Sequence, residues 1–264
     1  MEGVAGILLA GGRSQRMGRD KASLPWHGST LARRAVGLLV RVAEPPVIVV
    51  CAPDQELPPL PDWVDVVRDP EPGLGPLAGL AAGLAAAGTR AAVAAVCAVD
   101  APLAHPAVLA ALLDALGSSP AVVPLSEGRP QPLFAVYRTE LAFLAAALVA
   151  DGERRASALG ERAGARVVEP FELLVVDDVA AFDPALASFR SFDETDAYDG
   201  ALALPQPLVR VSGGLAGPAE LRASTVGRAT RLLAVDVAPE HPGAVPVDDE
   251  TPLFAGDRLV PAER

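Results

Sequence analysis

Short apolar runs rich in Val, Ile, Leu and Ala alternate along this chain with longer segments of Ala, Leu and interspersed polar residues. The short runs predict strands, at residues 4–10, 46–52, 65–69, 91–100, 120–126 and 131–138. The longer segments predict helices, at residues 29–43, 75–88 and 105–117, the first of them opened by Ser29. Apolar strands separated by helices indicate a mostly parallel sheet that is covered on both faces. The pattern therefore predicts a doubly wound α/β fold, whose ligands bind at the carboxyl ends of the strands.

The pattern changes near residue 205. Beyond this point it predicts two short strands, a helix within residues 226–237, and a final turn-rich pair of strands. This arrangement is typical of a small α+β unit with its own core. We therefore expect two domains, residues 1–204 and residues 205–264.

Composition and charge narrow the classes of partner. The chain has 264 residues, of which 51% are hydrophobic, so a sizeable core is expected and the class of disordered proteins is excluded. The formal net charge of -11 argues against nucleic-acid or anionic-membrane partners. Residues 1–41 differ, with seven Arg or Lys against two Asp or Glu, so their net charge is +5 and the rest carries -16. A small basic patch on an acidic body suits a small polyanion.

Neither the two cysteines nor the apolar segments indicate a metal site, a leader or a membrane span. Cys51 and Cys97 lie far apart, without the spacing of a metal site, and are expected to be buried thiols. No basic segment precedes an apolar leader at the N-terminus, and the most apolar window, 77–99, suits a helix followed by a strand. We expect a soluble cytoplasmic protein.

A glycine pair, Gly11-Gly12, follows the first strand and opens the basic segment RSQRMGRDK. Such a pair lets backbone N–H groups approach a phosphate closely, and Arg16 and Lys21 add positive charge. The spacing is not that of a Walker A loop, and Arg13 occupies the second glycine position of the dinucleotide fingerprint. The alternative interpretation is a tight turn whose arginines are solvated.

Lys21 is the only lysine of the chain, although arginine occurs throughout. Lysine brings a compact point charge to a phosphate, whereas the guanidinium group of arginine is a wide planar fork. We therefore predict that Lys21 is functional and contacts a phosphate group.

Asp100 follows an apolar strand, at the end where ligands gather in this fold class. Mg²⁺ is typically bound by one or two carboxylates together with phosphate oxygens and water. Beside a phosphate loop, Asp100 is predicted to bind Mg²⁺; the alternative is a helix cap, because Asp-Ala-Pro-Leu also suits the start of a helix. The histidines, His27, His105 and His241, form no cluster and are expected to be surface or cap residues.

The segment LLAGGRSQRMGRDKASLPWHGSTL, residues 8–31, resembles the nucleotidyltransferase signature of the molybdenum-cofactor guanylyltransferases. The resemblance continues at residues 68–84, 97–103 and 152–157 and extends over residues 4–200. It implies a Rossmann-like enzyme that transfers GMP from GTP to the phosphate of molybdopterin, or of its molybdenum-bearing form, and releases pyrophosphate. Catalysis of such a reaction depends on positioning the reactants and on neutralising the charge of the phosphates. The attacking phosphate is already ionised and needs no general base.

The resemblance also implies which residues form the site. The nucleotide is assigned to Leu9, Ala10, Gly11, Gly12, Arg16, Lys21, Asp69, Gly75, Pro76, Leu77 and Asp100. Among them, Arg16 and Lys21 contact the phosphates and, with the Mg²⁺ ligand Asp100, carry the catalysis. Asp69 and residues 75–79 line the base and ribose, and the intact LAGG and GPLAG segments favour GTP over CTP.

A second metal ligand is expected at Asp193, in the segment FRSFDETDAY at residues 189–198. The family usually has asparagines there, whereas this chain has Ser191 and Asp193. Two other functions therefore stay open. One is a related transferase that uses CTP or a different phosphate acceptor, and the other is a non-catalytic module that binds a nucleotide or the cofactor.

The C-terminal part is similar to the β-grasp fold of ubiquitin-like sulfur carriers, most clearly at VDDETPLFAGDRL, residues 247–259. Those carriers end in Gly-Gly, whereas this chain ends in VPAER. A docking partner or a purely structural role is therefore expected for this unit, in place of sulfur carriage.

Overall fold

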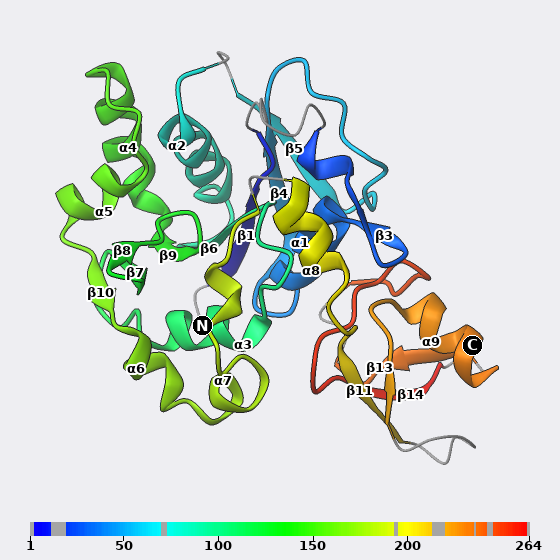
Figure 1. Ribbon diagram of the computed structural model, residues 1–264. Helices are drawn as coiled ribbons and strands as arrows, with labels where there is room; N and C mark the ends of the chain where they lie inside the picture. Colours follow the sequence, from blue (N-terminus) through cyan, green and yellow to red (C-terminus); the bar gives the residue numbers. More distant parts are fainter. Residues whose placement is uncertain are drawn as a thin grey trace.

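The computed structural model describes residues 3–11, 20–69, 73–192, 195–212, 220–234, 236–241 and 245–262. A large sheet forms its centre, with the strand order β10-β7-β9-β6-β1-β4-β5 and with β8 paired to β7 (Figure 1). The strands are β1 (Val4–Leu9), β4 (Glu44–Cys51), β5 (Val64–Arg68), β6 (Val93–Ala98), β7 (Ala121–Ser126), β8 (Arg129–Pro130), β9 (Ala135–Arg138) and β10 (Arg166–Val168).

Most neighbouring strands of this sheet are parallel. β1 pairs with both β4 and β6, β4 with β5, and β10 with β7, all in parallel register. The exceptions are β9, which lies antiparallel between β6 and β7, and the short β8, which is antiparallel to β7. The prediction of a doubly wound, mostly parallel α/β sheet is confirmed.

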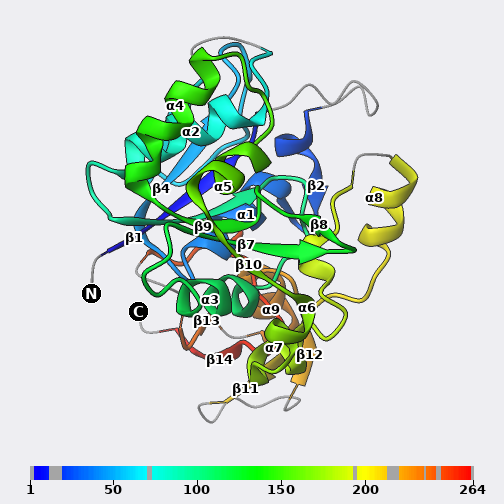
Figure 2. The same ribbon diagram turned by 90° about the vertical axis from the view of Figure 1, so that its left-hand side faces the viewer.

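Helices cover both faces of the sheet. Successive side chains of a buried strand point to opposite faces, so they pack against different helices. Leu8 packs in a cluster with α1 and α3, whereas Ile7 and Leu9 pack in a second cluster with α2, α4 and α5. In Figure 1, α2, α4 and α5 lie to the left of β1 and α1 lies to its right, and Figure 2 gives the view from that left-hand side. The helices are α1 (Leu31–Leu39), α2 (Pro76–Ala87), α3 (Pro106–Asp114), α4 (Ala142–Ala150), α5 (Ser157–Ala163), α6 (Pro170–Leu174), α7 (Asp177–Phe182) and α8 (Thr195–Leu202), with short 3-10 turns η1 (Lys21–Ser23), η2 (Thr139–Leu141) and η3 (Ala187–Phe189).

Two predicted elements begin later than the sequence pattern suggested. The first helix starts at Leu31, after Thr30, whose hydroxyl accepts a hydrogen bond from Arg33 N at 3.3 Å. Ser29, the expected cap, instead belongs to a two-residue-turn hairpin of β2 (Pro25–Trp26) and β3 (Ser29–Thr30). The turn of this hairpin is possible because His27 and Gly28 both adopt positive φ angles. Likewise, the strand expected at 131–138 pairs only from Ala135 onward.

The C-terminal residues form a separate four-stranded sheet with the order β12-β11-β14-β13. Its elements are β11 (Leu208–Val211), β12 (Glu220–Arg222), α9 (Val226–Leu233), β13 (Val237–Pro239) and β14 (Arg258–Pro261). β11 and β14 are parallel in the middle, and β12 and β13 flank them in antiparallel register. A small apolar cluster of its own, which includes Val209, Leu221 and Leu259, holds this unit together. The β-grasp interpretation of this unit stays a prediction.

Two smaller expectations concern burial. Cys51 and Cys97 are both free and buried, as predicted. Within the described ranges, no helix combines the length and the apolar content needed to cross a membrane.

Candidate functional site

The carboxyl ends of three central strands meet at one edge of the large sheet. Ala10 N and Gly11 N both donate to Val50 O, at 2.8 and 3.2 Å, and Val99 N donates to Leu9 O at 3.1 Å. A Cβ atom at Gly11 would lie 3.3 Å from Ala52 N, so a larger residue would push the two segments of the chain apart by a few tenths of an ångström. The side chains of Leu9 and Ala10 are buried, which leaves only their backbone groups for contact with a ligand.

Lys21 and Asp100, which are 79 residues apart in the sequence, form an ion pair at this edge. Lys21 Nζ lies 3.2 Å from Asp100 Oδ2, and the two side chains are 14% and 25% exposed. Asp100 does not cap a helix, because α3 begins at Pro106 with His105 as its cap. The prediction that His105 is a cap residue is confirmed, and the capping alternative for Asp100 is removed.

Gln55 holds the two ends of the basic loop together, and nothing in the sequence pattern pointed to it. Its Nε2 donates to Ala10 O at 3.0 Å and to Asp20 Oδ1 at 2.8 Å, while its Oε1 accepts from Ala52 N at 3.1 Å. Asp20 Oδ1 also accepts from Ala22 N at 3.0 Å and so caps the turn that carries Lys21. One carboxamide thus connects the end of β1, the loop after β4 and the start of η1.

Asp69 lies on the other side of the strand ends, against helix α2. Its backbone N donates to Cys51 O at 2.8 Å, and a Cβ at Gly79 would lie 3.7 Å from Asp69 Oδ2. Asp69 Oδ1 is buried and has no hydrogen-bond partner among the described residues. Burial raises the pKa of the Asp69 carboxyl group. A buried acceptor oxygen without a partner suits a ligand that brings a donor.

The start of α2 contacts the backbone of residues 152–157, which have the sequence GERRAS. Gly75 has a φ of +83°, and a Cβ there would lie 2.8 Å from Arg154 O, so the position requires glycine. Leu77 N donates to Arg154 O at 3.3 Å, and the Leu77 side chain is wholly buried. Pro76 occupies the first helical position, where its missing N–H costs nothing. Leu77 therefore contributes packing, and the Arg155 side chain turns to Glu153 at 2.8 Å.

Three predicted site residues, Gly12, Arg16 and Asp193, lie outside the described residues. The neighbour of Asp193 is nevertheless informative, because Phe192 N donates to Asp100 O at 3.1 Å. The chain that leads to Asp193 therefore runs beside Asp100.

The donor set suits a metal that is shared with phosphate. Among the described residues, no group of three or more His, Cys, Asp and Glu side chains is placed to hold an ion. Asp100 offers a partly exposed carboxylate at the strand ends. This chemistry fits Mg²⁺, which takes its remaining ligands from phosphate oxygens and water.

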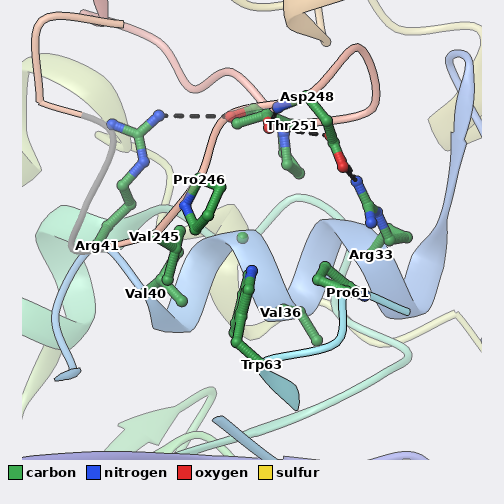
Figure 3. Close-up of a pocket in the computed structure, with 12 residues that line it drawn as sticks. Arg33, Val36, Val40, Arg41, Pro61, Trp63, Val245, Pro246, Asp248 and Thr251 are labelled. Atoms are coloured by element: carbon green, nitrogen blue, oxygen red, sulfur yellow. Dashed lines mark hydrogen bonds and ion pairs between the residues drawn. The ribbon is translucent and has the colours of Figure 1, made fainter. Parts of the chain in front are cut away.

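A small, shallow pocket lies elsewhere, along the seam between α1 and residues 245–252 (Figure 3). Arg33 and Arg41 extend across this seam toward the C-terminal segment, and Trp63 also lines the pocket. Arg33 Nη2 pairs with Asp248 Oδ2 at 2.6 Å, and Arg41 Nη2 pairs with Asp257 Oδ2 at 2.8 Å. The described residues that line the pocket include none of the predicted site, so it is a packing feature of the seam.

Residues 6–167 match the model of the MobA-like NTP transferase domain. A protein of Mycobacterium tuberculosis strain H37Rv, named probable molybdenum cofactor guanylyltransferase, is 46% identical over 163 residues, which cover 59% of this chain and 78% of that one. A Mycobacterium ulcerans protein of the same name is 45% identical over 165 residues, 60% of this chain and 79% of that one. The crystal structure of molybdopterin-guanine dinucleotide biosynthesis protein A from Archaeoglobus fulgidus has the same fold, with a TM-score of 0.58 and 22% identity over 75% of this chain and 96% of that chain.

Proposed function

The chain belongs to the MobA-like NTP transferase family and is a nucleotidyltransferase, and we propose that it transfers GMP from GTP to the phosphate of molybdopterin. The product would be molybdopterin guanine dinucleotide, with pyrophosphate released. The observation that carries the proposal is the meeting of Lys21 and Asp100 at 3.2 Å beside the strand ends that lead into the glycine pair. The choice of guanine and of a molybdenum cofactor is supported by the names of the mycobacterial relatives.

In this reaction a phosphate oxygen of the acceptor forms a bond to the α-phosphorus of GTP, and the bond from that phosphorus to pyrophosphate breaks. The acceptor phosphate is already ionised, so no side chain has to remove a proton. Lys21, and Arg16 by the family resemblance, would neutralise the charge on the phosphate oxygens and align them. Mg²⁺ bound by Asp100, with Asp193 as the proposed second ligand, would supply further charge neutralisation.

The remaining site residues would bind the nucleotide without taking part in the chemistry. The backbone of residues 9–12 would surround the phosphates, where Gly11 allows the close approach already described. The unpartnered Asp69 oxygen would accept from the base or ribose, and the start of α2 at residues 75–77 would form the adjoining wall. We also propose a domain boundary near residue 205, which the separate C-terminal apolar cluster supports.

Pyrophosphate release from GTP and from CTP tests this function. The protein is incubated with each nucleotide, with and without Mg²⁺ and molybdopterin. Release that requires GTP, Mg²⁺ and the pterin together is expected. Asp100→Ala is expected to abolish it, and Asp114→Ala, a change at an exposed aspartate at the end of α3, is the matched control.

Each other outcome points to one of the alternatives. Equal release from CTP would contradict the proposed nucleotide. Release from GTP only with another phosphate acceptor would contradict the proposed acceptor. Binding of GTP without any release would favour a non-catalytic module.

A further inference from the structure

We propose that residues 252–257, which we call the clamp, position the loop that carries Asp100. Under this proposal Arg34, His105 and Phe254 are positioning residues of the transfer reaction, although none of them touches the substrate. The clamp belongs to the C-terminal segment and lies outside the part that matches the family model, which ends at residue 167. The inference rests on the proposed role of Asp100 as a metal ligand.

The clamp has a defined shape of its own. Phe254 N donates to Asp257 Oδ2 at 2.9 Å, which closes a tight turn, and Gly256 has a φ of +84°. Arg41 pairs with the same Asp257 oxygen at 2.8 Å and so ties the turn to the chain after α1. Phe254 is 1% exposed and belongs to the core cluster beneath α1 and α3, not to the C-terminal cluster.

The first link from the clamp to the Asp100 loop is the guanidinium group of Arg34 on α1. Its Nη1 donates to Leu253 O in the clamp at 2.8 Å. Its Nε donates to Pro102 O at 3.3 Å, and its Nη2 to Ala104 O at 3.5 Å. Arg34 is 8% exposed, and its carbon Cζ lies 3.9 Å from the centre of the Phe254 ring. One buried cation therefore joins the clamp to two carbonyl groups of the loop.

The second link is His105, which ends the same loop. Its Nε2 lies 3.0 Å from Ala255 O in the clamp, and its Nδ1 accepts from Ala107 N at 3.2 Å. Since Nδ1 acts as an acceptor, the proton must lie on Nε2 and point to the clamp. His105 N donates to Ser188 Oγ at 2.9 Å, and the ring stacks on Phe182.

These contacts leave the Asp100 loop little freedom. Between Asp100 and His105 the chain has four residues, and the clamp holds this loop through Arg34 and directly at His105. At the other end, Asp100 O accepts from Phe192 N at 3.1 Å. The clamp therefore determines where the Asp100 carboxylate lies relative to Lys21, and losing the clamp would loosen the metal ligand without removing it.

A Mn²⁺-binding experiment distinguishes positioning from simple stabilisation. Mn²⁺ is titrated into the full-length protein with GTP, and free Mn²⁺ is followed by electron paramagnetic resonance. The test variants are Arg34→Met, His105→Ala and the milder Phe254→Leu. His105→Gln is the conservative variant, because its Nε2 is as many bonds from Cβ as the histidine Nε2 and can donate to Ala255 O. Arg33→Met is the control, because Arg33 pairs with Asp248 and has no hydrogen bond to the loop.

We expect the test variants to weaken Mn²⁺ binding by about tenfold, the effect of roughly one lost hydrogen bond on the geometry of a site. His105→Gln should keep the wild-type affinity within about twofold, and Arg33→Met should lower the melting temperature alone. Any of the other test variants that is unfolded at the assay temperature is left out. The proposal is overturned if Phe254→Leu and every remaining folded test variant bind Mn²⁺ with the wild-type affinity.

The proposed metal role of Asp100 is tested separately by Asp100→Ala in the same titration. Binding that is unchanged in Asp100→Ala refutes the metal role and the clamp proposal with it. Binding that is lost in Asp100→Ala but unchanged in the clamp variants refutes only the clamp proposal.

Discussion

Gln55 offers the sharpest test of the proposed role of the basic loop in nucleotide binding. Gln55→Ala removes the carboxamide that joins Ala10 O, Asp20 Oδ1 and Ala52 N, at 3.0, 2.8 and 3.1 Å. In the free protein the two ends of the loop are then no longer held together. The two ends must instead be brought together when GTP binds, and the cost of fixing them moves to the binding step.

The size of the effect follows from these three hydrogen bonds. A neutral hydrogen bond contributes about 1 kcal/mol net, and one to a carboxylate about 2 kcal/mol. Gln55 is half-buried, so water replaces part of what is lost. We therefore expect the free energy of GTP binding to be about 2 kcal/mol less favourable, which corresponds to a roughly 30-fold higher dissociation constant. Gln55→Glu should be worse than Gln55→Ala, because it places a second carboxylate 2.8 Å from Asp20.

Isothermal titration of GTP into the wild type and the two variants measures this effect. Gln131→Ala serves as the control, because it removes a glutamine whose Nε2 makes a local bond to Arg129 O at 3.2 Å. The change should appear in the dissociation constant and in KM more than in kcat. Dissociation constants within twofold of the wild type in both folded Gln55 variants would refute the reasoning.

Three further predictions concern other residues of the structure. Lys21→Arg should lower kcat/KM by about 100-fold or more at unchanged stability, because a planar fork cannot take the place of a compact ammonium group; near-normal turnover would show that charge alone is enough. Asp69→Asn should raise KM for GTP by about tenfold or more while leaving the melting temperature equal or higher at pH 7, because it replaces a buried carboxyl group whose pKa is raised by burial. Burial also lowers the pKa of His105, so its contribution to the free energy of unfolding is complete above about pH 6.5 and is lost as the pH falls through the folded pKa. Urea unfolding between pH 5 and pH 8 should therefore show a smaller loss of stability at low pH for His105→Asn than for the wild type, and equal slopes would contradict this assignment.

Local pattern determined most of the central fold. Uninterrupted apolar runs predicted the buried strands β1, β4 and β6, and the residues that follow them predicted where ligands gather. The single lysine and the aspartate after β6 were each predicted separately, from the chemistry of their side chains. Their pairing follows because β1 and β6 are parallel neighbours, whose carboxyl ends meet at the same edge of the sheet.

Element boundaries depended on interactions that a periodic pattern does not contain. Thr30 rather than Ser29 caps α1, because the positive φ angles of His27 and Gly28 fold the preceding residues into a hairpin. β9 lies antiparallel within a sheet of mostly parallel strands, although its own sequence resembles that of any buried strand. Strand direction is set by the connections and neighbours of a strand, not by its composition.

Only the tertiary structure decided which residues support the site from a distance. Gln55 lies in a proline-rich loop where nothing local marks it, and its role appears only when that loop meets Ala10 and Asp20. Arg34 and Leu253 are 219 residues apart and hydrogen-bond because α1 packs against the C-terminal segment. Sequence patterns report which face of an element is apolar, whereas contacts between distant polar groups arise from the way those faces pack. The sequence alone therefore predicted the candidate site residues at the strand ends. The residues that hold them in place could be identified only from the tertiary structure.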